Sequence, residues 1–192
     1  MQDPTAAPKA RGASPAARER LEPLLSERRI RARVATLGRR IDADYRRCEL
    51  SFVVVLKGAV VFAADLMRQV TRPCAVDFIT ASSYGTAARS SGTVTLGGLD
   101  RLNVTGSDVL VVEDILDTGR TCTAIIEGLQ PMAPASIALC ALLRKPGAAA
   151  LDLPVDYVGF DIPDEFVVGY GLDYAERYRN LRGIYRLRVA DG

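Results

Sequence analysis

The segment VLVVEDILDTGRT, residues 109–121, places three carboxylates within five positions at the end of an apolar run. These carboxylates belong to Glu113, Asp114 and Asp117. Their mutual repulsion is explained if they bind hydroxyl groups or a divalent cation. A sugar phosphate with vicinal hydroxyls and Mg²⁺ would need such a set. The simpler interpretation, that Asp117 only caps the helix that follows, accounts for one carboxylate and leaves two unexplained.

The residues after Asp117 predict an anion site of phosphate size. Thr118, Gly119, Arg120 and Thr121 lie between the apolar run and a predicted helix. Their backbone N–H groups and two hydroxyls can therefore line one concavity at the N-terminus of that helix. Gly119 allows the backbone to approach a bound anion closely.

The chain contains no histidine, which removes Ser-His and Cys-His nucleophile systems from consideration. Any general base must then be a carboxylate, Lys, Tyr or Cys. The four cysteines, Cys48, Cys74, Cys122 and Cys140, form no CxxC pair, and no His is present to complete a zinc site. Isolated thiols in apolar company are typical of reduced core residues, so we expect a cytoplasmic protein.

Buried strands that alternate with helices must position these groups. The run LSFVVVL and the run that ends at Glu113 each fit a strand that is buried on both faces. The alternation predicts an α/β fold with a mostly parallel twisted sheet flanked by helices, whose ligands bind beyond the carboxyl ends of the strands. We predict strands at 50–56, 75–80, 93–96, 108–113, 136–143, 155–160 and 183–189, and helices at 27–45, 59–70 and 120–130.

Length and charge fit one domain behind a short tail. The 192 residues suit a single core, and we predict a disordered tail over 1–20 and one domain over 21–192. The tail carries a net charge of +2, which equals that of the whole chain, so the folded body is near neutral. This balance argues against a nucleic-acid-binding protein. No apolar run reaches the roughly 18 residues of a membrane span, and neither GxGxxG nor GxxxxGK(S/T) occurs.

The segment 109–121 closely resembles the 13-residue signature of type I phosphoribosyltransferases, which bind phosphoribosyl pyrophosphate (PRPP). Four further segments resemble, in the same order, those of hypoxanthine-guanine phosphoribosyltransferases. They are VVLKGAVVFAADL, DFITASSYG, ALLRKP and VGFDIPDEFVVGYGLDYAERYRNL. The resemblance covers roughly residues 24–182 and implies a type I phosphoribosyltransferase fold with a small hood built from the terminal segments.

The resemblance implies roles for the signature residues. Glu113 and Asp114 would hold the ribose hydroxyls directly or through Mg²⁺, and Asp117 would be the acid/base group at purine N7. Residues 117–121 would cradle the 5-phosphate. Carboxylates beside the ribose would also stabilise the positive charge that builds on the ring as pyrophosphate leaves.

The other segments supply the pyrophosphate site and its cover. Lys57 and Gly58 would bind pyrophosphate in a turn with a non-proline cis bond after Leu56, although a snorkelling Lys is the simpler reading. Loop 81–92 would act as a lid, with Ser83 and Tyr84 closing over the site to exclude water.

The last two segments would form the base site. Phe166 would stack on the purine, the Val167 backbone would read its edge, and Lys145 would donate to O6. Asp173 would be a third metal ligand, beside Glu113 and Asp114, close to the base. Arg179 would contact pyrophosphate, with a solvated Arg as the alternative.

These implications favour an enzyme that transfers the phosphoribosyl group of PRPP to hypoxanthine or guanine, with Mg²⁺ as cofactor. Alternatives are a PRPP-binding regulator on the same fold, or a phosphoribosyltransferase for another base such as xanthine. We expect a homodimer or homotetramer that binds neither nucleic acid nor membrane.

Overall fold

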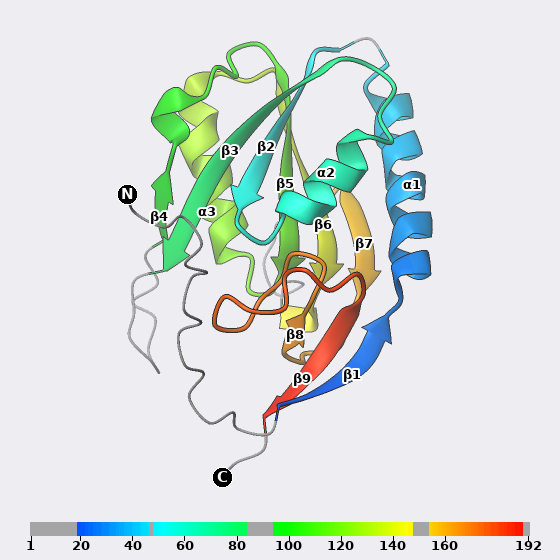
Figure 1. The fold of residues 1–192 in the computed structure, drawn as a ribbon. Coiled ribbons are helices and arrows are strands. Elements are labelled where there is room, and N and C mark those ends of the chain that lie inside the picture. The colour runs from blue at the N-terminus through cyan, green and yellow to red at the C-terminus, as the bar shows by residue number, and fades with distance from the viewer. Residues whose placement is uncertain (1–18, 47, 84–93, 148–153, 190–192) are drawn as a thin grey trace, which may run out of the picture.

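A twisted sheet of six strands forms the centre of the computed structural model, which describes residues 19–46, 48–83, 94–147 and 154–189. The strand order is β4-β3-β2-β5-β6-β7 (Figure 1). Strands β3, β2, β5, β6 and β7 pair in parallel, and β4 runs antiparallel to β3. The predicted mostly parallel sheet is thus confirmed. The strands are β2 (Leu50–Leu56), β3 (Cys74–Ser83), β4 (Val94–Gly97), β5 (Asp108–Leu116), β6 (Ser136–Arg144) and β7 (Tyr157–Asp161).

Helices cover both faces of this sheet, which explains the continuous apolar runs in its central strands. Along β2, Phe52 and Val54 belong to the cluster that contains α1 (Glu27–Asp44) and α2 (Val60–Met67). Val53 and Val55 point to the opposite face and pack with α3 (Arg120–Leu129). Successive side chains of a strand alternate between two buried layers in this way. Two short 3₁₀ turns, η1 (Leu99–Arg101) and η2 (Gln130–Met132), complete the connections.

A second, three-stranded sheet lies beyond the carboxyl ends of the central strands (Figure 1). Its order is β1-β9-β8, with β1 (Glu19–Leu25), β8 (Val167–Val168) and β9 (Ile184–Val189). Strands β1 and β9 come from the two ends of the described chain and pair antiparallel. This sheet is the predicted hood. The predicted tail over 1–20 needs a correction, because β1 already begins at Glu19, while residues 1–18 lie outside the described residues.

Several boundaries differ from those that the sequence predicts. Strand β5 continues through Leu116, three residues past its predicted end, because Ile115 and Leu116 still pair with β6. Strand β3 continues to Ser83, because Ser83 pairs with Val94 of β4, so the predicted loop 81–92 begins later. Helix α2 ends at Met67 instead of residue 70. Within the described ranges, no helix is long and apolar enough to cross a membrane.

Candidate active site

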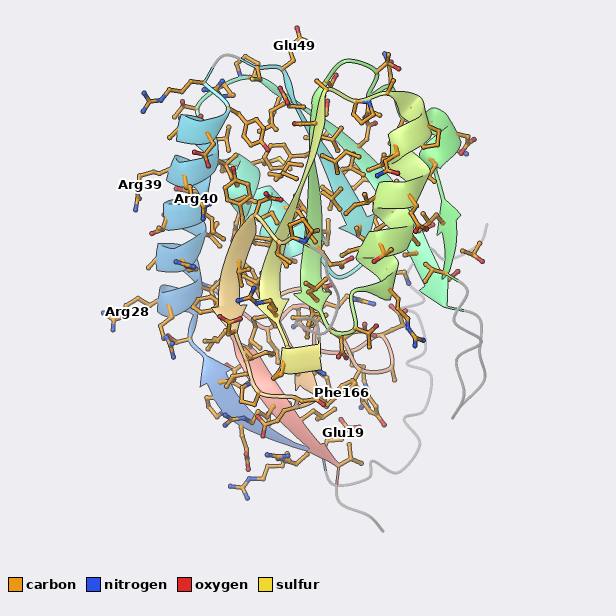
Figure 2. All side chains as sticks on the ribbon, turned by 180° about the vertical axis from the view of Figure 1, so that it is seen from behind. Glu19, Arg28, Arg39, Arg40, Glu49 and Phe166 are labelled. Atoms are coloured by element: carbon orange, nitrogen blue, oxygen red, sulfur yellow. The ribbon has the colours of Figure 1, made fainter. Side chains whose placement is uncertain are left out.

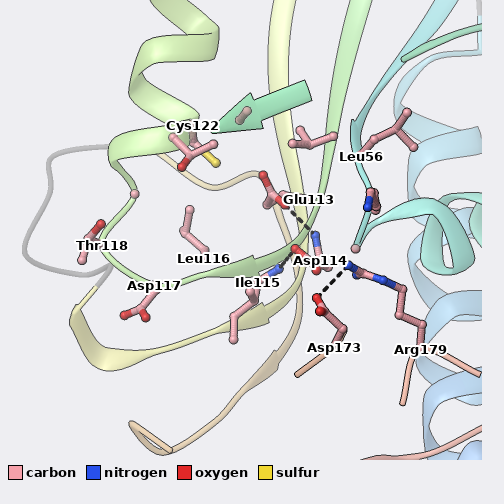
Figure 3. A pocket seen from close by; sticks show the side chains of 16 residues that line it. Leu56, Glu113, Asp114, Ile115, Leu116, Asp117, Thr118, Cys122, Asp173 and Arg179 are labelled. Atoms are coloured by element: carbon pink, nitrogen blue, oxygen red, sulfur yellow. Dashed lines mark hydrogen bonds and ion pairs between the residues drawn. The ribbon is translucent and has the colours of Figure 1, made fainter. Parts of the chain in front are cut away.

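A cavity of about 330 Å³ opens where β2 and β5 end, beneath the hood. Ten of the predicted site residues line it, drawn from the turn after β2, from β5 and its following loop, and from the loop between β8 and β9 (Figure 3). These ten are Lys57, Gly58, Glu113, Asp114, Asp117, Thr118, Gly119, Thr121, Asp173 and Arg179. Residues up to 122 positions apart in the chain therefore meet at one place, as expected for the carboxyl ends of a parallel sheet.

The two consecutive acids end the regular part of β5. Asp114 has no partner in the pairing of β5 with β6. Its backbone N–H instead donates to Glu113 Oε1, with 3.1 Å between nitrogen and oxygen. The Asp114 carboxylate accepts from the Ile115 N–H at 2.8 Å. Glu113 is only 6% exposed, and burial, with the negative charge of Asp114 beside it, raises the pKa of its carboxyl well above the usual range. The regular pairing of β5 with β6 is thus interrupted at the position where the two acids line the cavity.

Residues 117–119 turn the chain from β5 into α3. The N-cap of α3 is Gly119, with a φ of 73°, and no side chain caps this helix. The simpler interpretation of Asp117 as a helix cap is therefore wrong, and its carboxylate faces the cavity instead (Figure 3). Thr118, Gly119 and Thr121 line the cavity, whereas Arg120 is not among the lining residues.

The opposite wall is the turn after β2. The Leu56–Lys57 peptide bond is cis, as the family resemblance implied. Gly58 packs so closely that a Cβ added to it would lie 1.7 Å from Asp114 Oδ2. A Cβ added to Gly171 would likewise lie 2.1 Å from the Gly58 carbonyl oxygen. A side chain at Gly171 would therefore clash with backbone, and one at Gly58 would displace the Asp114 carboxylate.

An ion-pair network joins this turn to the loop between β8 and β9. Arg179 Nη2 lies 2.8 Å from Asp173 Oδ1 and 3.3 Å from Glu176 Oε2 (Figure 3 shows the first pair). Glu176 Oε1 also lies 3.0 Å from Lys57 Nζ. Hydrogen bonds from Lys57 and then Arg179 lower the pKa of Glu176, so its carboxylate stays charged. Glu176 therefore bridges the two cations predicted to contact pyrophosphate.

A second cavity, of about 250 Å³, adjoins the first and shares Asp114, Ile115, Asp117 and Asp173 with it. The predicted base-site residues Lys145, Phe166 and Val167 line this second cavity. The two cavities together therefore bring the predicted PRPP residues and the predicted base residues to one place.

Lys145 is the cation of the second cavity. Its Nζ lies 3.2 Å from Asp117 Oδ2 and 3.1 Å from Asp164 Oδ1, and its side chain is 11% exposed. Burial opposes the charge, but the bonds to Asp164 and Asp117 outweigh it and raise the pKa of Lys145. The ammonium therefore stays charged and remains a hydrogen-bond donor at the wall of this cavity.

An aromatic ring and a short strand complete this cavity. Phe166 is 53% exposed at the hood end of the molecule, opposite Glu49 (Figure 2). The rings of Phe166 and Tyr174 form a T-shaped pair with 5.7 Å between centroids, and Phe166 lines the cavity. The side chain of Val167 is buried, and its backbone pairs with Arg186 of β9.

The carboxylates do not form a ready-made metal cage. Among the described residues, no group of three or more His, Cys, Asp and Glu side chains converges closely enough to hold a metal ion. The expectation that Glu113, Asp114 and Asp173 gather as three ligands is thus not met by the protein alone. The donor chemistry still fits Mg²⁺, which proteins commonly bind through one or two carboxylates while substrate phosphates complete the shell.

Two acidic residues at the site were missed from the sequence. Glu176 pairs with Lys57 across 119 positions, and no local pattern predicts that contact. Asp164 pairs with Lys145, and its place two residues before Phe166 was the available signal. The lid role predicted for Ser83 and Tyr84 stays a prediction: Ser83 ends β3, and Tyr84 lies outside the described residues.

Comparison with known proteins agrees with this geometry. The family model described as "Phosphoribosyl transferase domain" matches residues 21–175. The hypoxanthine phosphoribosyltransferase of Salmonella typhimurium is 46% identical over 174 residues, which cover 89% of this chain and 97% of that protein. The hypoxanthine-guanine phosphoribosyltransferase of Mycobacterium tuberculosis is 47% identical over 165 residues, which cover 82% and 81%.

Solved structures agree as well. A crystal structure of a hypoxanthine-guanine phosphoribosyltransferase from Bacillus anthracis superposes with a TM-score of 0.81 at 41% identity, covering 88% of this chain and 99% of that one. One of a Staphylococcus aureus hypoxanthine phosphoribosyltransferase gives 0.79 at 41% identity, covering 87% and 91%. The chain therefore belongs to the phosphoribosyl transferase family and, within it, to the hypoxanthine(-guanine) phosphoribosyltransferases.

Proposed function

We propose that the protein transfers the phosphoribosyl group of PRPP to hypoxanthine or guanine and releases pyrophosphate. The observation that carries this proposal is the pair of adjoining cavities, which share Asp114, Asp117 and Asp173. One cavity has the features of an anion and sugar site, and the other has a Lys and an exposed aromatic ring. Their common wall is where a bond between ribose and base would form.

The first cavity suits PRPP. Backbone N–H groups at Thr118 and Gly119, at the start of α3, would hold the 5-phosphate. The buried carboxyl of Glu113 and the more accessible one of Asp114 would hydrogen-bond the ribose hydroxyls. The turn at Lys57 and Gly58 would receive the pyrophosphate, because two cations, Lys57 and Arg179, line the cavity beside it.

The second cavity suits a 6-oxopurine. The Lys145 ammonium is a donor only and would satisfy O6, while Phe166 would stack on the ring. Asp117 reaches both cavities and is 3.2 Å from Lys145, so it would accept the proton from N7. As it does so, N9 bonds to C1 of the ribose and the bond from C1 to pyrophosphate breaks.

The family requires a divalent cation, and we propose Mg²⁺ held by Asp114 and Asp173 together with oxygens of PRPP. When bound, the ion would offset the charge that builds on the departing pyrophosphate. Turnover should therefore stop after EDTA treatment and desalting, and should return when Mg²⁺ is added. Full activity in metal-free buffer would contradict this part of the proposal.

A pyrophosphate-release assay with hypoxanthine, PRPP and Mg²⁺ tests the transfer, and chromatography of the nucleoside monophosphate identifies the product. Tight PRPP binding without turnover would favour the alternative, a PRPP-binding regulator. Relative kcat/KM for hypoxanthine, guanine and xanthine decides which base is preferred. Size-exclusion chromatography with light scattering tests the expected homodimer or homotetramer.

A further inference from the structure

Three consecutive residues after β8 adopt left-handed backbone conformations. The φ angles are 100° at Gly169, 52° at Tyr170 and 102° at Gly171. Glycine adopts such angles freely, but a bulky residue such as Tyr does so only where its surroundings fix it. Because backbone strain of this kind concentrates at functional sites, the contacts of Tyr170 bear on the site beside it.

Two hydrogen bonds and burial hold Tyr170 in place. Its hydroxyl donates to Asp65 Oδ2 at 2.7 Å, and its N–H donates to the Leu181 carbonyl at 2.8 Å. The residue is only 5% exposed. Burial, and then the bond to Asp65, raise the pKa of the phenol, so the hydroxyl keeps its proton and remains a donor. The link to Asp65 is therefore a part-buried bond in which the phenol donates to a carboxyl oxygen.

This bond connects the two walls of the first cavity. Asp65 lies on α2, which begins at Val60, two residues after Gly58. Tyr170 precedes Gly171, whose backbone packs against the Gly58 carbonyl, and Asp173 follows two residues later. A shift of Tyr170 would therefore move the Asp173 loop relative to the turn at Gly58.

We propose that Asp65 and Tyr170 are positioning residues that set the distance between the Gly58 turn and the loop carrying Asp173 and Arg179. Neither Asp65 nor Tyr170 lines the 330 Å³ cavity, so they act through the residues that do. The space between those walls is the pyrophosphate site under the proposed function, on which this inference rests. Affinity for pyrophosphate should then depend on the bond between Tyr170 and Asp65, because small misplacements of binding groups are costly.

The test is calorimetric binding of pyrophosphate with excess Mg²⁺, together with the KM for PRPP. Tyr170→Phe and Asp65→Ala should each raise the pyrophosphate Kd and the PRPP KM by about tenfold, with kcat changed less than about threefold. The double variant should be no worse than either single variant, because both remove the same bond. Asp65→Asn should recover part of the affinity, since its amide oxygen can still accept from the phenol.

The chain offers a matched control in Tyr157, whose hydroxyl donates to Asp44 Oδ2 at 2.8 Å between β7 and α1. Neither Tyr157 nor Asp44 lines the two cavities. Tyr157→Phe removes the same kind of Tyr–Asp bond, so its thermal midpoint should fall by a similar amount while pyrophosphate affinity stays within about twofold of wild type.

Assays well below the unfolding transition keep stability and affinity apart. Wild-type pyrophosphate affinity in Tyr170→Phe, or an equal loss in Tyr157→Phe, would overturn the inference. A wild-type protein that binds neither PRPP nor pyrophosphate would instead refute the proposed function.

Discussion

Gly58 lies directly against Asp114: a Cβ on Gly58 would sit 1.7 Å from Asp114 Oδ2, far inside any allowed contact. Because Gly58 has no side chain, the turn after β2 can pack directly against the acidic end of β5. Gly171 also packs against Gly58, since a Cβ added to Gly171 would lie 2.1 Å from the Gly58 carbonyl oxygen. The shape of this wall of the 330 Å³ cavity therefore depends on two glycines and one carboxylate.

Gly58→Ala should displace the Asp114 carboxylate and lower kcat/KM for PRPP by about 10²-fold, because misplacement of about 1 Å can cost that much. Steady-state kinetics and a thermal melt measure the effect. Gly128→Ala in α3 is the control, since its Cβ would meet only the movable ends of two side chains, Leu99 at 2.8 Å and Leu96 at 3.4 Å. A Gly58→Ala enzyme with normal kinetics would show that the close fit has no functional role.

Asp117→Asn should keep the fold but reduce kcat by about 10² to 10⁴, the usual contribution of a positioned acid/base group. Asp164→Asn is the control. Asp164 contacts the same Lys145 ammonium at 3.1 Å but lines neither cavity, so its loss disturbs Lys145 without removing the acid/base group. Its kcat should remain within about threefold of wild type. Equal losses in the two variants would mean that Asp117 acts only by holding Lys145.

Wild type should reject adenine by about 10⁴ to 10⁵ in kcat/KM relative to hypoxanthine, because the Lys145 ammonium would face the 6-amino group donor to donor. Lys145→Ala should lose most of this discrimination. The neighbouring Arg144→Ala, which removes an ion pair with Asp161, is the control and should retain it. Use of adenine within about tenfold of hypoxanthine by wild type would refute the role of Lys145.

Asp42 should contribute to acid unfolding. Hydrogen bonds from Thr71 first, and then the Arg72 side chain, lower the pKa of Asp42 in the folded protein. The stabilisation is therefore fully present above the unfolded pKa of about 3.9 and is lost as pH falls through the lower folded value.

Thermal midpoints of Asp42→Asn, measured from about pH 6 down to pH 2, should accordingly fall less steeply than those of wild type. Asp100→Asn, at an exposed position in η1, should keep the wild-type slope. The same slope in all three proteins would exclude this contribution of Asp42.

The amino-acid sequence by itself determined the central sheet and most of the site. Runs such as Leu50–Leu56 predict doubly buried strands from local pattern alone, and strand ends on a parallel sheet meet at one edge. Local pattern and sheet topology therefore suffice to bring the acids of β5 and the loop to α3 to one edge of the sheet, whereas the base segments were assigned to the same site by their resemblance to the family. A short motif carries this information because its residues are neighbours in the chain.

Only the tertiary structure decided the contacts between distant segments. Strand β1, which contains Pro23, exists because it pairs with β9 from the other end of the chain, and β8 has only two residues. The bridge from Glu176 to Lys57, the fit of Gly171 on Gly58 and the bond from Tyr170 to Asp65 each join parts of the chain more than 100 residues apart. Their geometry arises from the packing of whole elements, and local propensity contains no information about that packing.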